Sequence, residues 1–466
     1  MQYIPRSAIL KKISNCPESG KSEKITTNQM SFSMRNVKDF GAIGDGVTLD
    51  TAAIQAALDA GGIVHFPEGT YLTGSVYLRS NGGLDLAPGA VILASPDPAH
   101  YNADDFIPEN RVFTAEKVSG SHLVIADNVD NVIIRGGGRI DGNRPAVLNQ
   151  PNPKNPKRFL ISGWRMGQML FFVNSTNIII EDIYLTESQY WNCFLHGCDY
   201  VKIRGVRIEN DFGTMNGDGI DVDCCRFVTI SDCIIHSADD CITLRGCADA
   251  LGGNRPCEYV TVNNCILSTR CNAFRIGVGS GSVRRCTLSN IIIRDTRTAI
   301  CLVSQYTPAS SGVQIEDIMF SNIYMDCVRF FNIATTPRGL RPEEAKVIRR
   351  ISFNNLRGSA DTGSIIQGSR KGYVQDIIFT DLKVDYRPSV NVNPEVPEYG
   401  YGEFIKDGNP PAAFYLHNAD DVKFKNSSIN LPENDEGYLY SIMGINSSFN
   451  LSEDFTANRD VINKNC

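Results

Sequence analysis

The sequence predicts an all-β protein built as a single-stranded parallel β-helix, a solenoid, with a helical cap at its N-terminal end. A short β-branched run, a polar residue or turn, and a second apolar run recur along the chain. Runs of this kind begin at Asn131, Asn177, Tyr200, Phe227 and Tyr259. Apolar residues alternate within each run, as in a strand with one buried face. Equivalent positions such as Ile178, Val201, Val228 and Val260 lie roughly 23 to 32 residues apart, which is a solenoid repeat.

Each coil of a solenoid buries its apolar face only against its neighbours, so the end of the stack needs a cover. Residues 50–60 (DTAAIQAALDA) favour a helix with one apolar face and are expected to cap the first coil. We expect residues 1–33 to form a polar N-terminal arm and residues 34–466 to form the β-helix. The stretch 388–411 contains five prolines and three glycines, so it is predicted to be an irregular excursion.

Composition limits the partners of the chain. Hydrophobic residues make up 42% of the 466 residues, charged residues only 21%, and the net charge is -7. Basic residues cluster only in short pairs such as Arg349-Arg350, which argues against nucleic acid as a partner. No apolar run reaches the length of a membrane span, and none near the N-terminus fits a secretory signal. The sequence therefore predicts no membrane partner and a cytoplasmic protein as it stands, or a secreted or periplasmic one if a signal peptide has been removed. It does not predict the oligomeric state.

Cysteine is frequent, with 15 residues scattered from Cys16 to Cys466. The number is odd, and no pair has the spacing of a zinc site. We interpret these cysteines as small buried hydrophobic residues rather than as a disulfide framework.

Three aspartates are separated by about one repeat. Asp218 stands before Gly219-Ile220, and Asp239 and Asp240 follow 21 and 22 residues later, before Cys241-Ile242. If that interval is one coil, the three carboxylates meet on one wall. Acid/base cleavage of a glycosidic bond needs such a group, because one carboxyl gives a proton while another takes one from water.

Aspartate is also common at corners, where its side chain caps backbone N–H groups. That role accounts for one aspartate better than for three together, because like charges disfavour each other's ionisation. Mutual repulsion would leave one acid protonated beside ionised bases. The residues alone do not say which of the three holds the proton.

Several motifs resemble family 28 of the glycoside hydrolases, the polygalacturonases and rhamnogalacturonan hydrolases, over residues about 37 to 330. They are the opening VKDFGAIGDGVTLDTAAIQ at residues 37–55, GGGRIDG at 136–142, SQYWNCFLH at 188–196, NGDGID at 216–221 and DDCI at 239–242. The resemblance implies a right-handed β-helix and hydrolysis without a metal or other cofactor. It also implies that Asp239 is the general acid, while Asp218 and Asp240 align the water that attacks with inversion.

The chain departs from that family at two places. The family's Gly-His-Gly corresponds to Cys271-Asn272-Ala273, and its Arg-Ile-Lys corresponds to Cys301-Leu302-Val303. The family's basic residues hold the substrate carboxylate, so this chain is expected to recognise its sugar differently.

Strand alternation predicts what lies beside the aspartates. If Ile220, Ile242 and Phe274 point inward, then the neighbouring side chains point outward. The predicted outward patch consists of Asp221, Asp223, Thr243, Arg245 and Arg275. Two interpretations of its arginines remain open: an exposed salt-bridge ladder worth roughly 0 to 1 kcal/mol per pair, or a fork that binds a sugar carboxylate or sulfate.

Other residues complete the predicted substrate-binding set of Asn216, Asp221, Arg245, Asn272, Arg275 and Trp191. Asn272 either hydrogen-bonds a sugar hydroxyl or caps a corner. Trp191 either supports a sugar ring or packs in the core, which is the commoner fate of tryptophan. His196 is expected to be structural. The insert 246–256 is expected to lengthen a loop at one end of the cleft.

The sequence as a whole predicts a metal-free, inverting glycoside hydrolase that attacks chain ends of an acidic, pectin-type oligo- or polysaccharide. Two alternatives are a β-helix lyase or fructan-type transferase, and a carbohydrate-binding solenoid without catalysis.

Overall fold

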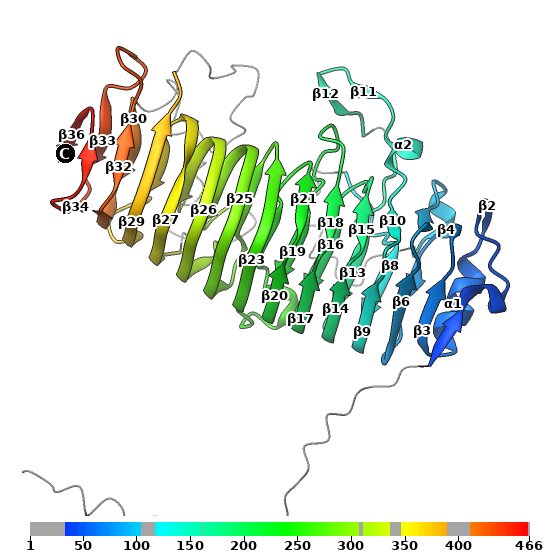
Figure 1. Ribbon diagram of the computed structural model, residues 1–466. Coiled ribbons are helices and arrows are strands. Elements are labelled where there is room, and N and C mark those ends of the chain that lie inside the picture. Colours follow the sequence, from blue (N-terminus) through cyan, green and yellow to red (C-terminus); the bar gives the residue numbers. More distant parts are fainter. Residues whose placement is uncertain are drawn as a thin grey trace, which may run out of the picture. The chain divides into compact units, whose positions relative to one another are not determined.

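The computed structural model describes residues 33–103, 117–161, 163–306, 311–335, 346–388 and 411–464. They form a right-handed parallel β-helix, as predicted, whose coils follow one another along the chain (Figure 1). The proposed arm lies outside the described residues except for Ser33, and so does most of the proposed excursion at 388–411.

Short strands make up the N-terminal half of the helix. They are β1 (Met34–Asn36), β2 (Asp45–Leu49), β3 (Gly62–Phe66), β4 (Gly69–Thr73), β5 (Val76–Tyr77), β6 (Gly82–Leu86), β7 (Ala90–Ala94), β8 (Val124–Asp127), β9 (Asp130–Arg135), β10 (Arg139–Asp141), β13 (Leu170–Val173), β14 (Thr176–Glu181), β15 (Tyr184–Thr186), β16 (Cys193–His196), β17 (Asp199–Arg204), β18 (Arg207–Glu209), β19 (Ile220–Asp223), β20 (Arg226–Ser231), β21 (Ile234–Ser237) and β22 (Ile242–Gly246).

Several later strands continue around corners and are longer. The C-terminal half comprises β23 (Cys257–Thr269), β24 (Asn272–Gly279), β25 (Ser282–Val303), β26 (Gln314–Ala334), β27 (Ile348–Thr362), β28 (Ser364–Gln367), β29 (Val374–Tyr386), β30 (Ala412–His417), β31 (Ala419–Lys425), β32 (Ser428–Asn430), β33 (Tyr440–Ile445), β34 (Phe449–Leu451), β35 (Thr456–Ala457) and β36 (Asp460–Lys464). Helical segments are η3 (Val37–Phe40), α1 (Thr51–Asp59), η4 (Pro98–His100), α2 (Arg144–Val147) and η7 (Asp249–Leu251).

Successive coils stack in parallel register. Ile178 pairs with Val201, Val201 with Val228, and Val228 with Val260. These are the positions that the sequence repeat aligned. An exception is β11 (Pro151–Asn152), which pairs antiparallel with β12 (Asn155–Phe159) in a hairpin that projects from the coils (Figure 1).

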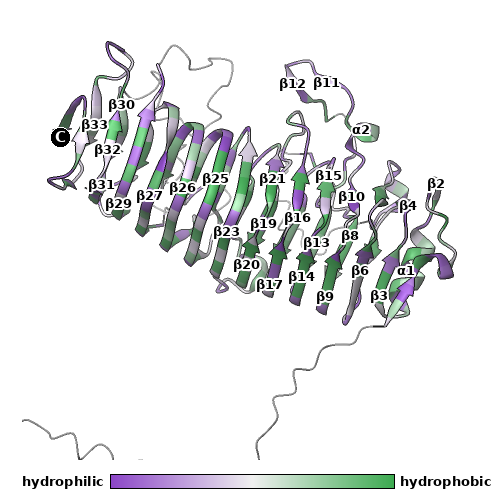
Figure 2. Ribbon diagram, viewed as in Figure 1, coloured by the Kyte–Doolittle hydropathy of each residue, from purple (hydrophilic) through white to green (hydrophobic). Residues whose placement is uncertain are grey.

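Apolar side chains fill the interior in columns that run along the helix. Figure 2 shows hydrophobic segments recurring on the strands of successive coils. Toward the C-terminus one column becomes aromatic, and Phe320, Phe353, Phe379 and Phe424 stack with ring centroids 4.8 to 5.1 Å apart. Each ring packs on the next coil, so the coils stabilise one another as a solenoid requires.

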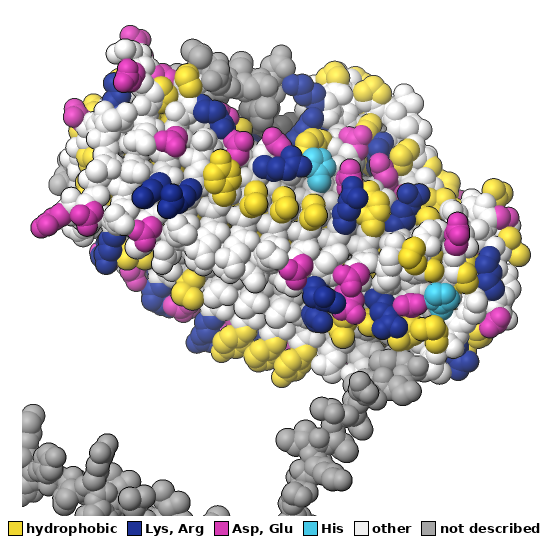
Figure 3. Space-filling model, viewed as in Figure 1, with side chains coloured by type: hydrophobic (Ala, Val, Ile, Leu, Met, Phe, Trp, Pro, Cys, Tyr) yellow, Lys and Arg dark blue, Asp and Glu magenta, His cyan; other side chains and the backbone are white. Residues whose placement is uncertain are grey.

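Left-handed backbone conformations recur at the corners between strands. Asn131 and Asn177 have φ of 59° and 53°, but the equivalent residues on later coils are Tyr200, Phe227 and Tyr259, with φ of 56° to 58°. This conformation is strained for aromatic residues. The three rings stack on one another at 4.9 and 5.3 Å, which offsets the strain. They remain partly exposed, and Figure 3 shows exposed hydrophobic side chains in rows that cross successive coils.

The predicted cap is present as α1. Ile54, Ala57 and Leu58 of this helix are buried in the core. Asp50, just before the helix, accepts hydrogen bonds from the amides of Ile43 (2.7 Å) and Gly44 (2.9 Å) and so fixes the loop before it.

The 13 cysteines in the described part of the chain are unpaired, and all except Cys247 and Cys271 are buried. This confirms their interpretation as small hydrophobic residues there; Cys16 and Cys466 lie outside the described residues. Among the described helices, none has the length and apolar character to span a membrane.

Candidate active site

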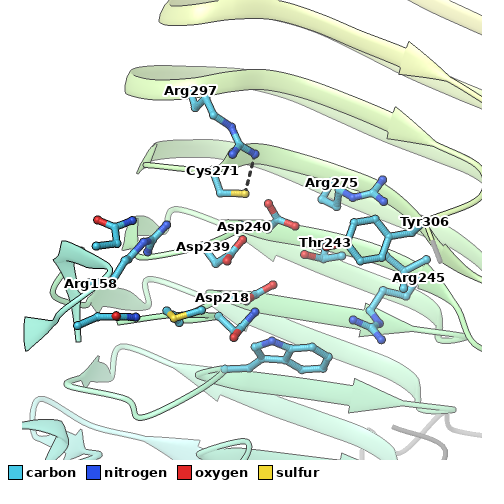
Figure 4. Close-up of a pocket in the computed structure, with 16 residues that line it drawn as sticks. Arg158, Asp218, Asp239, Asp240, Thr243, Arg245, Cys271, Arg275, Arg297 and Tyr306 are labelled. Atoms are coloured by element: carbon cyan, nitrogen blue, oxygen red, sulfur yellow. Dashed lines mark hydrogen bonds between the residues drawn. The ribbon is translucent and has the colours of Figure 1, made fainter. Parts of the chain in front are cut away.

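Parallel stacking brings the three aspartates together. Asp218 precedes β19 and Asp239-Asp240 precede β22 on the next coil, where the Gly219 amide donates to the Asp240 carbonyl at 2.8 Å. All three side chains line one cleft of about 250 Å³. Figure 4 shows them grouped at its centre.

Four arginines surround the carboxylates. Arg158 reaches the cleft from β12, Arg245 from β22, Arg275 from β24 and Arg297 from β25 (Figure 4). The remaining lining residues are Asn152, Asn155, Trp191, Met215, Asn216, Thr243, Cys271, Val278 and Tyr306.

The carboxylates differ in environment. Asp218 and Asp240 are buried, whereas Asp239 is half-buried and faces the cleft. Burial and the charge of Asp239 raise the pKa of the Asp240 carboxyl, while Arg275 and hydrogen bonds from Cys271 and Asn272 oppose the rise. Asp240 therefore retains its proton to a higher pH than an isolated aspartate does.

Asn272 does not line the cleft. Its side-chain amide donates to Asp240 Oδ1 at 2.6 Å, and its backbone amide donates to the same oxygen at 3.2 Å. The structure thus places Asn272 behind Asp240, where it orients the carboxylate; its contact with a sugar remains a prediction.

The outward patch has the predicted register. Asp221 pairs with Thr243, and Thr243 pairs with Arg275 on the next coil. The expectation that this ladder is exposed is wrong, because its side chains are between 0% and 3% exposed. Aromatic rings cover it: Arg245 lies 4.5 Å from the Trp191 ring centroid and Arg275 lies 5.1 Å from that of Tyr306.

Asp221 and Asp223, the two buried acids of this ladder, differ in their partners and in their pKa values. Asp221 does not line the cleft, its carboxylate oxygens accept no hydrogen bond within the described chain, and Arg245 Nη1 is 3.6 Å away. Burial raises the pKa of Asp221 to about 8 despite Arg245. Burial also acts on Asp223, but His196, Arg245 and the Cys247 amide outweigh it and lower the pKa of Asp223 to about 2. The Nδ1 atom of His196 lies 3.4 Å from Asp223 Oδ2, in keeping with the predicted structural role.

Trp191 both borders the cleft and packs in a cluster. Tyr190 stacks on it with ring centroids 4.9 Å apart, and Arg245 packs on it as well. The ring is 3% exposed, so it has no open face on which a sugar could stack.

Asn216 lines the cleft and is held by Arg165, whose side chain is fully buried. Its guanidinium donates to the Met215 carbonyl (2.6 Å), to Asn216 Oδ1 (3.1 Å) and to the Gln189 carbonyl (3.1 Å). It therefore fixes the loop that leads to Asp218.

Sequence reasoning missed Arg158, Arg297 and Cys271 as cleft residues. Arg297 could have been found, because Thr298 stacks on Asn272 in register, which places Arg297 one coil beyond Cys271. Arg158 could not, because only the hairpin fold brings it over the site.

The insert 246–256 does not border the cleft as expected, since none of residues 247–256 lines it. Arg255 instead anchors the insert to the Cys224 carbonyl (2.7 Å) and to Asp199 (2.6 Å). The cleft wall comes from the β11–β12 hairpin.

Asp239, Asp240 and Cys271 have metal-ligand atoms within 4.8 Å of one another. However, Arg297 Nη2 lies 3.0 Å from the Cys271 sulfur, so a guanidinium already brings positive charge to this cluster. The donor set is a poor fit to a cation for that reason.

Comparisons with known proteins agree with the fold and the motifs. A probable polygalacturonase of Vitis vinifera is 31% identical over 224 residues, which are 46% of this chain and 44% of that protein. An exo-poly-alpha-D-galacturonosidase of Dickeya chrysanthemi is 23% identical over 357 residues, or 66% of this chain and 58% of that protein. Both alignments thus span less than two thirds of the relative.

A crystal structure of an exopolygalacturonase from Thermotoga maritima superimposes with a TM-score of 0.66 and 22% identity, covering 85% of this chain and 92% of that one. This likeness supports the β-helix fold. The model of the glycosyl hydrolases family 28 matches residues 107–330, which contain all three cleft aspartates. Over residues 107–330, just under half of its length, the chain therefore matches family 28 of the glycosyl hydrolases.

Proposed function

We propose that the protein is an inverting, exo-acting glycoside hydrolase for acidic, pectin-type oligosaccharides. The observation that carries this proposal is the convergence of Asp218, Asp239 and Asp240 on one cleft. Relatives that are named polygalacturonase or exo-poly-alpha-D-galacturonosidase support the choice of a pectin-type substrate.

The environments of the carboxylates suit separate roles. Asp239 is the most accessible and acts as the general acid, giving its proton to the glycosidic oxygen as the bond to the anomeric carbon breaks. Asp218 and Asp240 align a water molecule on the opposite face and take its proton as its oxygen bonds to that carbon. Asn272 holds one oxygen of Asp240 with two N–H groups and leaves the other for water.

The charge of the cleft favours an acidic sugar. Four arginines line it beside three aspartates, although the basic pair of the family motif is absent at Cys301-Leu302-Val303. Guanidinium groups recognise carboxylates in two-pronged geometry, so an anionic ligand can bind despite the aspartates.

The β11–β12 hairpin supports attack at a chain end. Asn152, Asn155 and Arg158 of this hairpin line the cleft, and Arg158 Nη1 fastens it to the carbonyl groups of Phe212 (3.0 Å), Thr214 (3.3 Å) and Ala238 (3.4 Å). These carbonyls belong to the loops before Asp218 and Asp239. The hairpin thus walls the small cleft, which suits a short chain end better than a long polymer.

A reducing-sugar assay on oligogalacturonides, rhamnogalacturonan oligosaccharides and sulfated oligosaccharides tests this function, with NMR detection of the first anomer released. We expect turnover with inversion, and a loss of at least about 10³-fold in Asp239→Asn. Asp249→Asn, at an exposed aspartate outside the cleft, is the matched control and should retain activity. Unsaturated products absorbing in the ultraviolet, or saturable binding without turnover on any sugar, would contradict the proposal.

A further inference from the structure

Two rows of exposed apolar side chains lie on a face of the β-helix outside the cleft. The first row is aromatic and consists of Tyr200, Phe227 and Tyr259. The second row pairs in register on successive coils and consists of Ile234, Ile266, Ile292 and Tyr324. These side chains are 37% to 59% exposed, and none of them lines the cleft. Figure 3 shows two such rows on one face of the molecule, so they form the borders of a single surface.

The surface between the rows is polar and almost without charge. Four successive coils form it, and we call it the threonine face; it consists of residues 228–234, 260–266, 286–292 and 318–324. Asp232 is the one charged residue in these segments. Its carboxylate already accepts hydrogen bonds from Ser231 (2.8 Å) and Asn264 (2.6 Å), so it is bonded within the face.

Hydroxyl groups stand in lines along the threonine face. Thr229 pairs with Thr261, and Thr261 pairs with Thr287 on the next coil. These side chains are exposed or half-buried, and no hydrogen bond within the described chain occupies their hydroxyl groups. A parallel line consists of Ser231, Asn263, Ser289 and Ser321. Each coil therefore offers hydrogen-bond donors and acceptors at equivalent positions along the axis.

A protein partner fits this face poorly. Interfaces between proteins are most apolar at their centre and polar at their rim, whereas here apolar rows border a polar centre. Four coils spaced at about 4.8 Å and seven residues at about 3.3 Å span roughly 450 Å². A stable protein interface takes about 800 Å² from each partner, so a second copy of the chain would bind this face only weakly.

A neutral, extended polysaccharide has the chemistry that this face can bind. Its hydroxyl groups can pair with the threonine and asparagine side chains, while its C–H groups pack against the apolar rows. Its lack of charge matches a face whose one carboxylate is bonded to its neighbours. The coils repeat at about 4.8 Å, close to the length of one sugar unit, so a chain that lies along the axis meets the same groups on each coil.

We propose that the threonine face is an accessory site that binds a neutral, extended polysaccharide along the axis of the β-helix. The site is separate from the cleft and needs neither the aspartates nor the arginines there. It holds the protein on an insoluble polysaccharide while the cleft stays open to a second ligand.

Sedimentation of the full-length protein with cellulose and with insoluble xylan measures this binding. The triple variant Thr229→Ala/Thr261→Ala/Thr287→Ala removes the central hydroxyl groups, so we expect its affinity to fall at least about tenfold. An excess of oligogalacturonide should leave wild-type binding unchanged, because an acidic ligand has no charged partner on this face. Displacement of the wild type by oligogalacturonide would overturn the proposal.

A second variant tests the apolar border. The double variant Ile266→Ser/Ile292→Ser should lower the affinity by a similar factor, because it removes apolar contact area. The matched control is Val47→Ser/Leu49→Ser, since these side chains are 81% and 40% exposed on β2, outside the face. The control should bind as the wild type does. Melting curves from circular dichroism show whether each variant is folded.

Three outcomes would contradict the accessory site. Unchanged binding in both face variants would do so, as would a wild type that binds neither polysaccharide. A dimer in sedimentation equilibrium that both variants dissociate would assign the face to a second copy of the chain instead. None of these measurements needs turnover, so their outcome is independent of the proposed hydrolase function.

Discussion

Asn272 holds Asp240 through two donors to a single oxygen. The Asn272 side-chain amide lies 2.6 Å and its backbone amide 3.2 Å from Asp240 Oδ1. The asparagine occupies the position of the histidine in the family's Gly-His-Gly motif. A residue expected to touch the substrate thus holds a carboxylate of the cleft in this structure.

Removing that side chain should impair turnover more than binding. Asn272→Ala leaves Asp240 with fewer donors to its ionised form, so we expect kcat to fall roughly 10- to 100-fold with KM changed less than about threefold. The pKa of Asp240 should rise further, which moves the acidic limb of the kcat–pH profile upward. Asn264→Ala is the control, because Asn264 makes the same contact, 2.6 Å to Asp232, on the exposed surface. An unchanged acidic limb in Asn272→Ala would contradict the assigned role.

Asp221 should make stability fall as pH rises. Its pKa is about 8 in the folded protein and near the ordinary value of 3.8 when unfolded, so the folded state binds more protons between these values. Its contribution is therefore fully present below about pH 4 and is lost as pH rises through 8. Asp221→Asn should remove this slope and raise the melting temperature at pH 8, as measured by circular dichroism. Asp223→Asn should destabilise instead at neutral pH, because the pKa of Asp223 is about 2 and its charge is paired. A melting temperature of Asp221→Asn below that of the wild type at pH 8 would refute this account.

Removing the guanidinium group of Arg165 should lower both the stability and the activity of the protein. In the wild type the guanidinium carbon of Arg165 lies 4.7 Å from the Tyr190 ring centroid. Arg165→Met keeps an apolar contact with this ring but leaves the buried carbonyl groups of Gln189 and Met215 without their hydrogen-bond donor. We expect a loss of about 2 to 4 kcal/mol in unfolding free energy and a lower kcat, because the loop before Asp218 loses its anchor. Arg207→Met is the control, because it removes an arginine that packs on the Tyr184 ring at an exposed site. It should change neither the unfolding free energy nor kcat. A destabilised variant with full kcat would show that Arg165 supports the fold alone.

The β11–β12 hairpin should determine the mode of attack. Residues 151–159 can be replaced by a short Gly-Ser turn, because the Leu160 amide already bonds to the Gln150 carbonyl at 2.7 Å. The shortened protein should release longer oligosaccharides from a polymer and lower its viscosity faster than the wild type does. Shortening the distant loop 432–437 serves as the control. Mixed oligosaccharides as the first products of the intact protein would contradict exo action.

Chelation should leave activity unchanged. In the described chain, the acidic cluster with Cys271 already contains the guanidinium of Arg297. Dialysis against EDTA followed by the reducing-sugar assay checks this. The assay is then repeated after Ca²⁺ or Zn²⁺ has been added to the dialysed protein. A metal-dependent recovery of activity would contradict it.

The sequence by itself determined the solenoid and the meeting of the three aspartates in one cleft. Period-2 alternation and a repeat of one coil are local properties of the chain, and parallel stacking converts that repeat directly into contact between Asp218 and the Asp239–Asp240 pair. The register of Asp221 with Thr243 and Arg275 followed from the same rule.

Only the tertiary structure decided what covers the strands and what closes the cleft. Alternation tells which side chains leave the core, but not whether another element lies over them, so the ladder of Asp221 and Arg245 was expected at the surface and is buried under Trp191. The hairpin that carries Arg158 and the buried anchor Arg165 act through contacts about 50 to 80 residues away in sequence. Such contacts depend on how loops pack against the coils, which no repeat encodes.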